Sequence, residues 1–281
     1  RDIIREASKR GGNILIPAFA VGRTQEIIFR LGGFYQEGIL NHQAVYLDSL
    51  FNTGRDHDWA IIGAGVLPSD EQMRSVLAGQ DFLTTVVEQS ASRSAARVTG
   101  AMIDFLSPND PAAIIRTLSD PSIRIVSLTI TEGGYFIDPA TGEFDARNPE
   151  IMADGATPES PKTVFGVIVA GLKRRRQAGI EPFTVMSCDN IPHNGVVACN
   201  AVAGLARLSD PELSQWILDQ VAFPNGMVDR ITPATGDRER EILTRDFGIE
   251  DNWPVFCEDF TQWVLEDRSG YSRQPSSTYS H

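Results

Sequence analysis

The sequence predicts an α/β fold with a doubly wound, mostly parallel sheet and helices on both faces. Strand-like and helix-like segments alternate from about residue 12 to residue 266, which is the order expected when helices connect parallel strands. Ile123–Ile130 is rich in β-branched residues, which is typical of a strand buried on both faces of such a sheet. Glycine and polar residues directly follow several predicted strands, and this class of fold binds ligands at the carboxyl ends of its strands.

Composition limits the functions that are open to the chain. Its 281 residues allow one large domain or two small ones, and 42% apolar residues are enough to form a core. Disorder is therefore excluded, and no apolar run reaches the roughly 18 residues that a membrane span needs. The 25 basic and 37 acidic residues give a formal net charge of −12, which argues against nucleic acid as a partner. Only three of the basic residues are lysines, namely Lys9, Lys162 and Lys173.

Cysteine usage points to a reducing compartment. Cys188, Cys199 and Cys257 are too few and too far apart for a disulfide framework or a zinc site. The chain begins with the charged segment Arg1–Arg10 and not with a signal peptide or an initiator methionine. We therefore expect a cytoplasmic protein, and a fragment of a longer chain is an open alternative.

Short segments bounded by turn residues make up the first third of the chain. Arg1–Arg10 has the pattern of an amphipathic helix that ends at Gly11-Gly12, and Thr24–Leu31 fits either a strand or a buried helical turn. Strands are expected at Asn13–Ile16, Ala44–Leu47, Trp59–Gly63, Phe82–Glu88 and Ala96–Phe105.

Capping signals mark two helices in the first half. Ser69 and Gln72 have the spacing of a capping box, and Gly79 ends the predicted helix. Asp110 is a good N-cap residue and is followed by a proline, so a helix is expected from there to Leu118.

Helices and strands alternate regularly in the second half. The clearest helix begins at Ser160-Pro161, stops at Gly179 and carries the cations Lys173–Arg176 near its negative end. Its apolar face is formed by Phe165, Ile168, Val169 and Leu172. Other helices are expected at Val196–Leu208, Pro211–Val221 and Asp237–Phe247, and strands at Phe183–Cys188, Met227–Ile231, Val255–Cys257 and Trp263–Leu265. A disordered tail is expected at Ser269–His281.

Two glycine segments are candidates for binding a phosphate. Leu31-Gly32-Gly33-Phe34 and Gly63-Ala64-Gly65 each contain glycines after a predicted strand, which lets the backbone approach a pyrophosphate. Both segments also fit plain turns. Asp70 could accept a hydrogen bond from a ribose hydroxyl, although an aspartate in the first turn of a helix needs no function.

Polar residues after two predicted strands are candidates for catalysis. Thr131-Glu132-Gly133-Gly134-Tyr135 follows the run Ile123–Ile130, and its two glycines allow a bend that directs Glu132 into a crevice or simply into solvent. Ser187-Cys188-Asp189-Asn190 follows the next strand, and Asn190 could donate a hydrogen bond to an oxyanion or hydroxyl. The alternative for the second segment is an Asx turn with a helix cap at Asn194. His193 fits either an acid–base group or an exposed loop residue.

A fourth candidate segment is Phe223–Pro233, in which Asp229-Arg230 could form an ion pair in a cleft or a structural one. His42, His57 and His281 are scattered and do not have the spacing of metal ligands, so no metal site is expected.

Several long motifs in register resemble the mannitol dehydrogenase family of polyol-specific long-chain dehydrogenases and related hexuronate reductases. The resemblance covers about residues 31–267. The matching motifs are H-Q-A-V-Y-L-D-S-L (His42–Leu50), D-W-A-I-I-G-A-G-V-L-P (Asp58–Pro68), I-V-S-L-T-I-T-E-G-G-Y (Ile125–Tyr135), F-T-V-M-S-C-D-N-I (Phe183–Ile191), F-P-N-G-M-V-D-R-I-T-P (Phe223–Pro233) and F-T-Q-W-V-L-E-D (Phe260–Asp267).

This resemblance implies NAD-dependent oxidation of a polyol to a ketose, or the reverse reaction. It implies a Rossmann-type N-terminal domain and a helical C-terminal domain, with a small polyol or ketose bound between them. Glu132 would lie in a proton path beside the active site, and Asn190 would hold the reacting oxygen. The residues expected to contact the cofactor are Gly32, Gly33 and Phe34 at the pyrophosphate, Val228 and Asp229 near the nicotinamide, and Asp70, Thr131, Asp189 and Asn190.

Two departures from the family pattern shape the expected organisation. Arg5–Glu26 resembles the β-CASP metallo-β-lactamase-fold proteins, which are zinc-dependent nucleases, but their H-x-H-x-D-H motif is absent. The family's catalytic K-x-x-x-x-N-x-x-H segment and its helical domain are also absent. We therefore expect a leader at residues 1–30 that is separate or supplies the first strand, an NAD-binding domain at 31–268 and a tail at 269–281.

Three functions are consistent with these observations. The first is a truncated or chimeric NAD-dependent polyol dehydrogenase with weak or no turnover, because a missing general base costs a factor of roughly 10² to 10⁴. The second is a dinucleotide-binding module without chemistry. The third is a fragment of a metal-dependent nucleic-acid hydrolase.

Overall fold

The computed structural model describes residues 59–90, 92–229, 232–260 and 262–266. The elements predicted before residue 59 and the tail at 269–281 lie outside these ranges. Contacts divide the chain into two compact units. Within the described ranges, the smaller unit comprises residues 59–61, 80–90, 92–103 and 232–260, and the larger comprises residues 62–79, 104–229 and 262–266.

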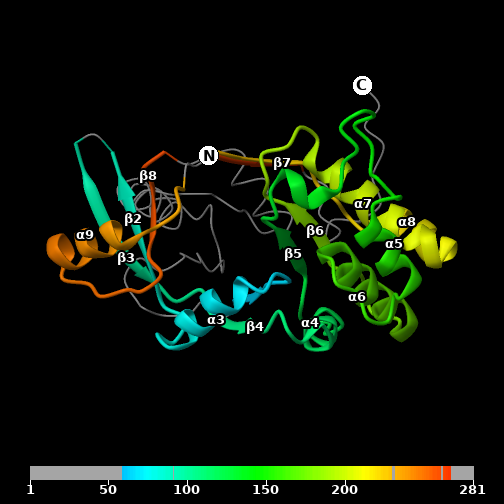
Figure 1. Ribbon diagram of the computed structural model, residues 1–281, viewed down its shortest axis with the longest axis horizontal. Helices are drawn as coiled ribbons and strands as arrows, with labels where there is room; N and C mark the ends of the chain where they lie inside the picture. The colour runs from blue at the N-terminus through cyan, green and yellow to red at the C-terminus, as the bar shows by residue number, and fades with distance from the viewer. Residues whose placement is uncertain (1–58, 91, 230–231, 261, 267–281) are drawn as a thin grey trace, which may run out of the picture. The chain divides into compact units, whose positions relative to one another are not determined.

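The larger unit is built on a parallel pair of strands. Strand β5 (Ile125–Leu128) pairs with β6 (Thr184–Ser187), and the register runs from Ile125 opposite Thr184 to Leu128 opposite Ser187. The chain between them is helical, as parallel strands require. The helices of this unit are α3 (Asp70–Ala78), α4 (Pro111–Leu118), the 3₁₀ helix η1 (Glu132–Tyr135), α5 (Pro149–Ala156), α6 (Val164–Ala178), α7 (Asn194–Ser209) and α8 (Pro211–Gln220) (Figure 1).

The main core lies between this strand pair and α5–α8. Its fully buried side chains come from each of these elements, and they include Phe165 and Leu172 on α6, Val185 on β6 and Ile217 on α8. Alternation of strand and helix in the described chain confirms the predicted α/β class.

Helix α6 begins three residues later than predicted. Its N-cap is Thr163, whose hydroxyl accepts a hydrogen bond from the Gly166 amide at 3.0 Å. The buried carboxylate of Asp154 accepts from the amide of Lys162 and from the amide and hydroxyl of Thr163. The preceding segment is therefore fixed as a loop. The predicted stop is confirmed, because Gly179 has φ 68°, a left-handed conformation that favours glycine.

The smaller unit contains a three-stranded sheet with β2 (Thr84–Gln89) in the middle. Strand β3 (Ser94–Thr99) pairs with it antiparallel, and β8 (Val255–Glu258) pairs with it parallel. Helix α9 (Asp237–Phe247) has the predicted bounds and packs Leu243 against Val87 and Phe256.

Two short strand pairs complete the described elements. Strand β1 (Ile61–Ala64) pairs with β4 (Met102–Leu106), and β7 (Gly226–Asp229) pairs antiparallel with β9 (Gln262–Leu265). The single strand predicted at Ala96–Phe105 is wrong, because the chain leaves the strand conformation at Gly100-Ala101 and forms β3 and β4 instead.

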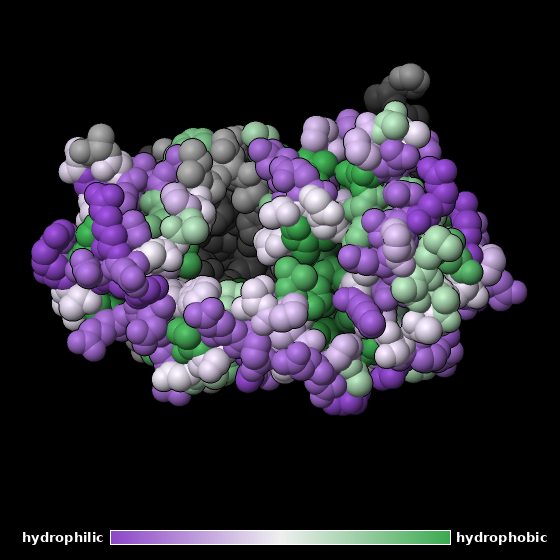
Figure 2. All heavy atoms as spheres, in the orientation of Figure 1, coloured by the Kyte–Doolittle hydropathy of each residue, from purple (hydrophilic) through white to green (hydrophobic). Residues whose placement is uncertain are grey.

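Strand β5 is not buried on both faces in the described structure, contrary to the prediction for Ile123–Ile130. Ile125 is 45% exposed, whereas Leu128 is 3% exposed. Within the described ranges β5 hydrogen-bonds only to β6, so one edge has no partner there. Figure 2 shows apolar residues at the surface in the region where Figure 1 places β5.

Among the residues that the structure describes, no helix combines the length and the apolar character that a membrane crossing requires.

Candidate functional site

The chain turns sharply where β5 ends. Thr131 has φ 61° and ψ 170°, a conformation that is costly for a β-branched residue. Glu132 follows with an exposed side chain and begins the 3₁₀ helix η1. Gly134 lies so close to Ile130 that an added Cβ would be 2.9 Å from the Ile130 Cβ. A tight turn is therefore present here as predicted, but its left-handed angle lies at Thr131 and not at Gly133 or Gly134, and η1 brings Tyr135 back into the core.

The carboxylate of Asp189 joins the ends of β5 and β6. It accepts hydrogen bonds from the amides of Ile130 and Thr131, each at 3.0 Å, and from the hydroxyl of Tyr135 at 2.7 Å. Two of these donors are 58 and 59 residues away along the chain. One side chain after β6 therefore fixes the turn that presents Glu132 after β5.

Tyr135 acts as a donor in this network. Its ring is fully buried, and burial raises the pKa of its hydroxyl well above the usual value, with the neighbouring Asp189 adding to the rise. The phenol therefore keeps its proton and donates it in the hydrogen bond to Asp189. The Ser187 hydroxyl, 2.6 Å from the Tyr135 oxygen, is then the donor in the second contact.

A buried asparagine joins the end of β6 to the start of β7. The Asn194 side chain is 1% exposed. Its Nδ2 donates to the carbonyl oxygens of Gly226 at 2.9 Å, Asp189 at 3.1 Å and Ser187 at 3.3 Å. Its Oδ1 accepts from the Gly226 amide at 2.9 Å. The alternative interpretation of this segment placed a helix cap at Asn194, but the N-cap position is taken by His193, which has φ 54°.

A second asparagine, in the loop before β7, bonds to the start of α7. The Asn225 Oδ1 accepts from the amides of Gly195 at 2.9 Å and Val196 at 3.3 Å, at the start of α7. The backbone amide of Asn225 donates to the Glu266 carboxylate at 3.0 Å. The loop before β7 is thus attached both to α7 and to the end of β9.

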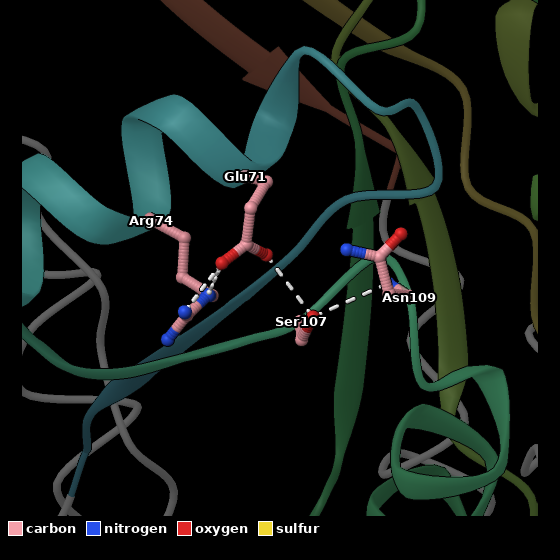
Figure 3. A network of polar contacts seen from close by, with 4 residues as sticks. All are labelled: Glu71, Arg74, Ser107 and Asn109. Carbon is pink, nitrogen blue, oxygen red and sulfur yellow. Dashed lines mark hydrogen bonds and ion pairs between the residues drawn. The ribbon is translucent and has the colours of Figure 1, made fainter.

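A separate network surrounds the start of α3 (Figure 3). The Asp70 carboxylate accepts from the Leu67 amide at 3.0 Å. Glu71 pairs with Arg74 and accepts from the Ser107 hydroxyl at 3.0 Å. The hydrogen bond from Arg74 lowers the pKa of Glu71, so its carboxylate stays ionised. This network joins the first turn of α3 to the loop after β4.

The predicted capping box at the start of α3 is wrong. Ser69 has helical backbone angles, φ −62° and ψ −26°, and its side chain caps no amide. Asp70 instead fixes the preceding turn through Leu67. Gly65 is required here, because a Cβ at that position would collide with Asp70.

The structure brings together some of the predicted site residues. Thr131 and Glu132 lie beside Asp189 and Asn190 through the Asp189 contacts, and the Asn194 contacts attach β7, which contains Val228 and Asp229. The side chains of Val228 and Asp229 lie outside the described part of the chain, as do Arg230 and the segment Gly32, Gly33 and Phe34. Asp70 belongs to the α3 network.

Tyr135 and Ser187 lay in the candidate segments and Asn194 was considered as a helix cap, but none of the three was predicted to hold the site together. All three are buried polar side chains that follow or end a strand. Position after a strand was the available signal, but it does not show which backbone groups a side chain reaches.

The described residues contain no group of three His, Cys, Asp or Glu side chains that could hold a metal ion. Burial raises the pKa of the Cys188 and Cys199 thiols. They are therefore protonated, poorly nucleophilic thiols at neutral pH.

Comparison with known proteins identifies the family. Residues 38–276 match the mannitol dehydrogenase Rossmann domain. The chain is 60% identical over 227 residues to mannitol 2-dehydrogenase of Cereibacter sphaeroides, covering 80% of this chain and 47% of that protein. It is 42% identical over 281 residues to mannitol 2-dehydrogenase of Aspergillus fumigatus, covering 98% of this chain and 55% of that protein. The chain thus spans about half the length of these relatives.

Solved structures agree with this result. A Pseudomonas fluorescens mannitol 2-dehydrogenase in ternary complex with NAD and D-mannitol matches with a TM-score of 0.74 and 53% identity, covering 78% of this chain and 45% of that one. A substrate-free D-sorbitol dehydrogenase matches with a TM-score of 0.74 and 47% identity, covering 78% and 46%.

The resemblance of Arg5–Glu26 to β-CASP proteins is not borne out. The Aspergillus alignment covers 98% of this chain and therefore extends into these residues. The short apolar and glycine pattern that suggested another family is thus too brief to be specific. The fold is Rossmann-type, as predicted, and the chain belongs to the mannitol dehydrogenase Rossmann domain family.

Proposed function

We propose that this chain is the NAD-binding part of a polyol dehydrogenase that transfers hydride between a polyol or ketose and the nicotinamide. The joined ends of β5 and β6 carry this proposal, because Asp189 holds two exposed polar residues, Glu132 and Asn190, at one edge of a parallel strand pair. Dinucleotides bind at this edge in doubly wound folds. The relatives named mannitol 2-dehydrogenase support the reaction class.

The residues at this edge fit a dinucleotide. Thr131 makes the sharp turn after β5, and neighbouring Glu132 and Asn190 are exposed to a ligand. We assign the pyrophosphate turn to Gly32, Gly33 and Phe34 and a ribose hydroxyl to Asp70. Thr131, Asp189, Asn190, Val228 and Asp229 would contact the nicotinamide half.

The proposed mechanism gives separate tasks to two side chains. The cofactor supplies a hydride acceptor. The Asn190 amide donates a hydrogen bond to the reacting oxygen and stabilises the charge that develops there. Glu132, exposed at the first position of η1, passes the released proton to water. Asp189 keeps both residues in place, because proximity is the protein's main contribution to hydride transfer.

We propose NAD as the cofactor, and the alternative NADP is suggested by one relative. The chain is 46% identical over 251 residues to a polyol:NADP oxidoreductase of Gluconobacter oxydans, covering 88% of this chain and 50% of that protein. The structure solved with NAD and D-mannitol has the higher identity of 53%. The half-buried carboxylate of Asp70 favours a free ribose hydroxyl, because a carboxylate repels a phosphate.

The remaining assignments follow from this proposal. The NAD-binding domain would comprise residues 31–268, residues 1–30 would supply its first strand, and 269–281 would be a tail. The partners would be small polyols or ketoses and not nucleic acid, since the net charge is −12. The compartment would be the cytoplasm.

Calorimetric titration of the chain with NADH and NADPH tests the proposal, followed by fructose reduction with the cofactor that binds. We expect saturable NADH binding that is at least about tenfold tighter than NADPH binding. Absence of NADH binding would overturn the proposal. Measurable turnover would favour the dehydrogenase over a dinucleotide-binding module, whereas binding without turnover fits both, and preference for NADPH would reassign the cofactor.

A further inference from the structure

We propose that Asn194 is a positioning residue for the cofactor site, which sets where β7 and its Val228-Asp229 pair lie relative to Asn190. The inference rests on the proposed function, since a change in the position of β7 is detected as a change in cofactor affinity. Asn194 is 1% exposed and contacts only protein backbone in the hydrogen bonds described above. It would therefore act through other residues and not on the cofactor itself.

The Asn194 side chain pairs with Gly226 as a neighbouring strand would. Its Oδ1 accepts from the Gly226 amide at 2.9 Å, and its Nδ2 donates to the Gly226 carbonyl at 2.9 Å. Residues that face each other in an antiparallel ladder exchange the same two bonds. The carboxamide thus replaces one peptide unit at a place where, among the described residues, β7 pairs only with β9.

The same amide group also reaches the chain after β6. Nδ2 lies 3.3 Å from the Ser187 carbonyl and 3.1 Å from the Asp189 carbonyl. These carbonyls belong to the short segment that directly precedes Asn190. A single side chain therefore fixes the first residue of β7 and the residues just before Asn190, which are separated by more than thirty positions.

The surroundings leave little freedom for this arrangement to shift. Gly195 lies against the backbone of the Phe223-Pro224 loop so closely that a Cβ there would collide with the Pro224 carbonyl. The Oδ1 of Asn225, in the same loop, accepts hydrogen bonds from the amides of Gly195 and Val196. Only a carboxamide of this length both donates to and accepts from Gly226, because a hydroxyl is too short and a carboxylate cannot donate.

The test compares Asn194→Ala with a matched control, Ser214→Ala. Ser214 is also buried in the larger unit, and its hydroxyl donates to the Ala203 carbonyl at 2.8 Å. Both variants lose a buried hydrogen-bonding group and should unfold at lower denaturant. For Asn194→Ala alone, we expect the Kd for NADH to rise about tenfold, because the fraction of chains with the competent geometry falls. Amide hydrogen exchange should accelerate at Gly226 in that variant.

Asn194→Ser is the second variant, for the case that Asn194→Ala does not fold, since serine keeps a small polar group at this position. Its hydroxyl cannot bridge both groups of Gly226, so the same rise in Kd is expected. A folded variant with a Kd within about twofold of the wild-type value would overturn the inference. An equal rise in Ser214→Ala would also overturn it. If the wild-type chain does not bind NADH, the proposed function fails and the inference fails with it.

Discussion

The three hydrogen bonds to Asp189 make the substitution Asp189→Asn a sharp test of how the site is held together. Oδ2 accepts from the Ile130 amide and the Tyr135 hydroxyl, and Oδ1 accepts from the Thr131 amide. Asparagine keeps the shape but replaces one of these oxygens by an NH₂ group, which cannot accept. In its better orientation the asparagine oxygen still accepts from the Ile130 amide and the Tyr135 hydroxyl, and the asparagine NH₂ group then faces the Thr131 amide, which is also a donor.

The size of the effect follows from these contacts. A hydrogen bond to a charged group contributes about 1.5–3 kcal/mol, and the substitution removes one such bond and the charge that strengthens the other two. We therefore expect the free energy of unfolding to fall by about 2–4 kcal/mol. Tyr135→Phe deletes the hydroxyl alone and should cost about 1.5–3 kcal/mol. Because both variants weaken the same contact, the double variant should lose less than the sum, with a coupling of about 1 kcal/mol.

Urea unfolding followed by circular dichroism measures these differences, with equal m-values as the check that the unfolded state is unchanged. Asp210→Asn is the matched control. The Asp210 Oδ1 accepts from the Leu213 amide at 2.9 Å as the N-cap of α8, and asparagine caps equally well. Its cost should be a few tenths of a kcal/mol. If Asp189→Asn costs no more than this control, or if the cycle with Tyr135→Phe shows no coupling, the carboxylate does not hold the site as described.

Three further predictions concern strain, a buried cation and pH. Thr131→Gly should stabilise the chain by about 1 kcal/mol in urea unfolding, because glycine adopts φ 61° without the strain of a β-branched residue; an unchanged or lower stability would contradict the assigned backbone. Arg175→Met should cost about 3–4 kcal/mol, because the buried guanidinium donates to several backbone carbonyls, among them Leu118 at the end of α4, and a loss under about 1 kcal/mol would contradict this role. Burial raises the pKa of Tyr135 above 10.0, so its phenol ionises more readily in the unfolded chain, and the resulting stability is full below pH 10.0 and lost as the pH rises further. Stability measured against pH should show a shallower alkaline decline in Tyr135→Phe than in wild type, and identical declines would refute the shift.

The elements that were predicted well are those whose signals act within a few residues. Asp110 accepts from the Ala113 amide at 2.9 Å and begins α4 as expected, and Gly179 ends α6 in the left-handed conformation. Ser69 failed as a cap because it already has helical backbone angles, and the turn before it is held by the adjacent carboxylate of Asp70, which accepts from the Leu67 amide. Neighbouring polar residues thus decide between local alternatives that the spacing alone leaves equal.

Contacts between distant segments could not be predicted in this way. The sequence placed polar residues after two strands, and parallel topology then brought Thr131 close to Asp189. It did not reveal that Asn194 reaches Gly226, which is 32 residues away. Arg175 was interpreted as a helix-end charge, yet it is buried and donates to the Leu118 carbonyl, 57 residues away. Such pairings depend on how the helices pack, which periodicity does not encode.

The strand ends explain why polar side chains that bond to the backbone are needed at this site. Where β5 and β6 end, the backbone ladder stops, and the amides and carbonyls of the next residues need other partners. Asp189 supplies acceptors to the chain after β5, and Asn194 supplies both kinds of group to β7. Asp189 and Asn194 both lie within a few residues of Asn190. The segment that contains this exposed residue therefore also fixes the chain after β5 and the start of β7. In the proposed mechanism, positioning and catalysis thus fall to different side chains, because Asp189 and Asn194 hold the backbone while Glu132 and Asn190 stay exposed to a ligand.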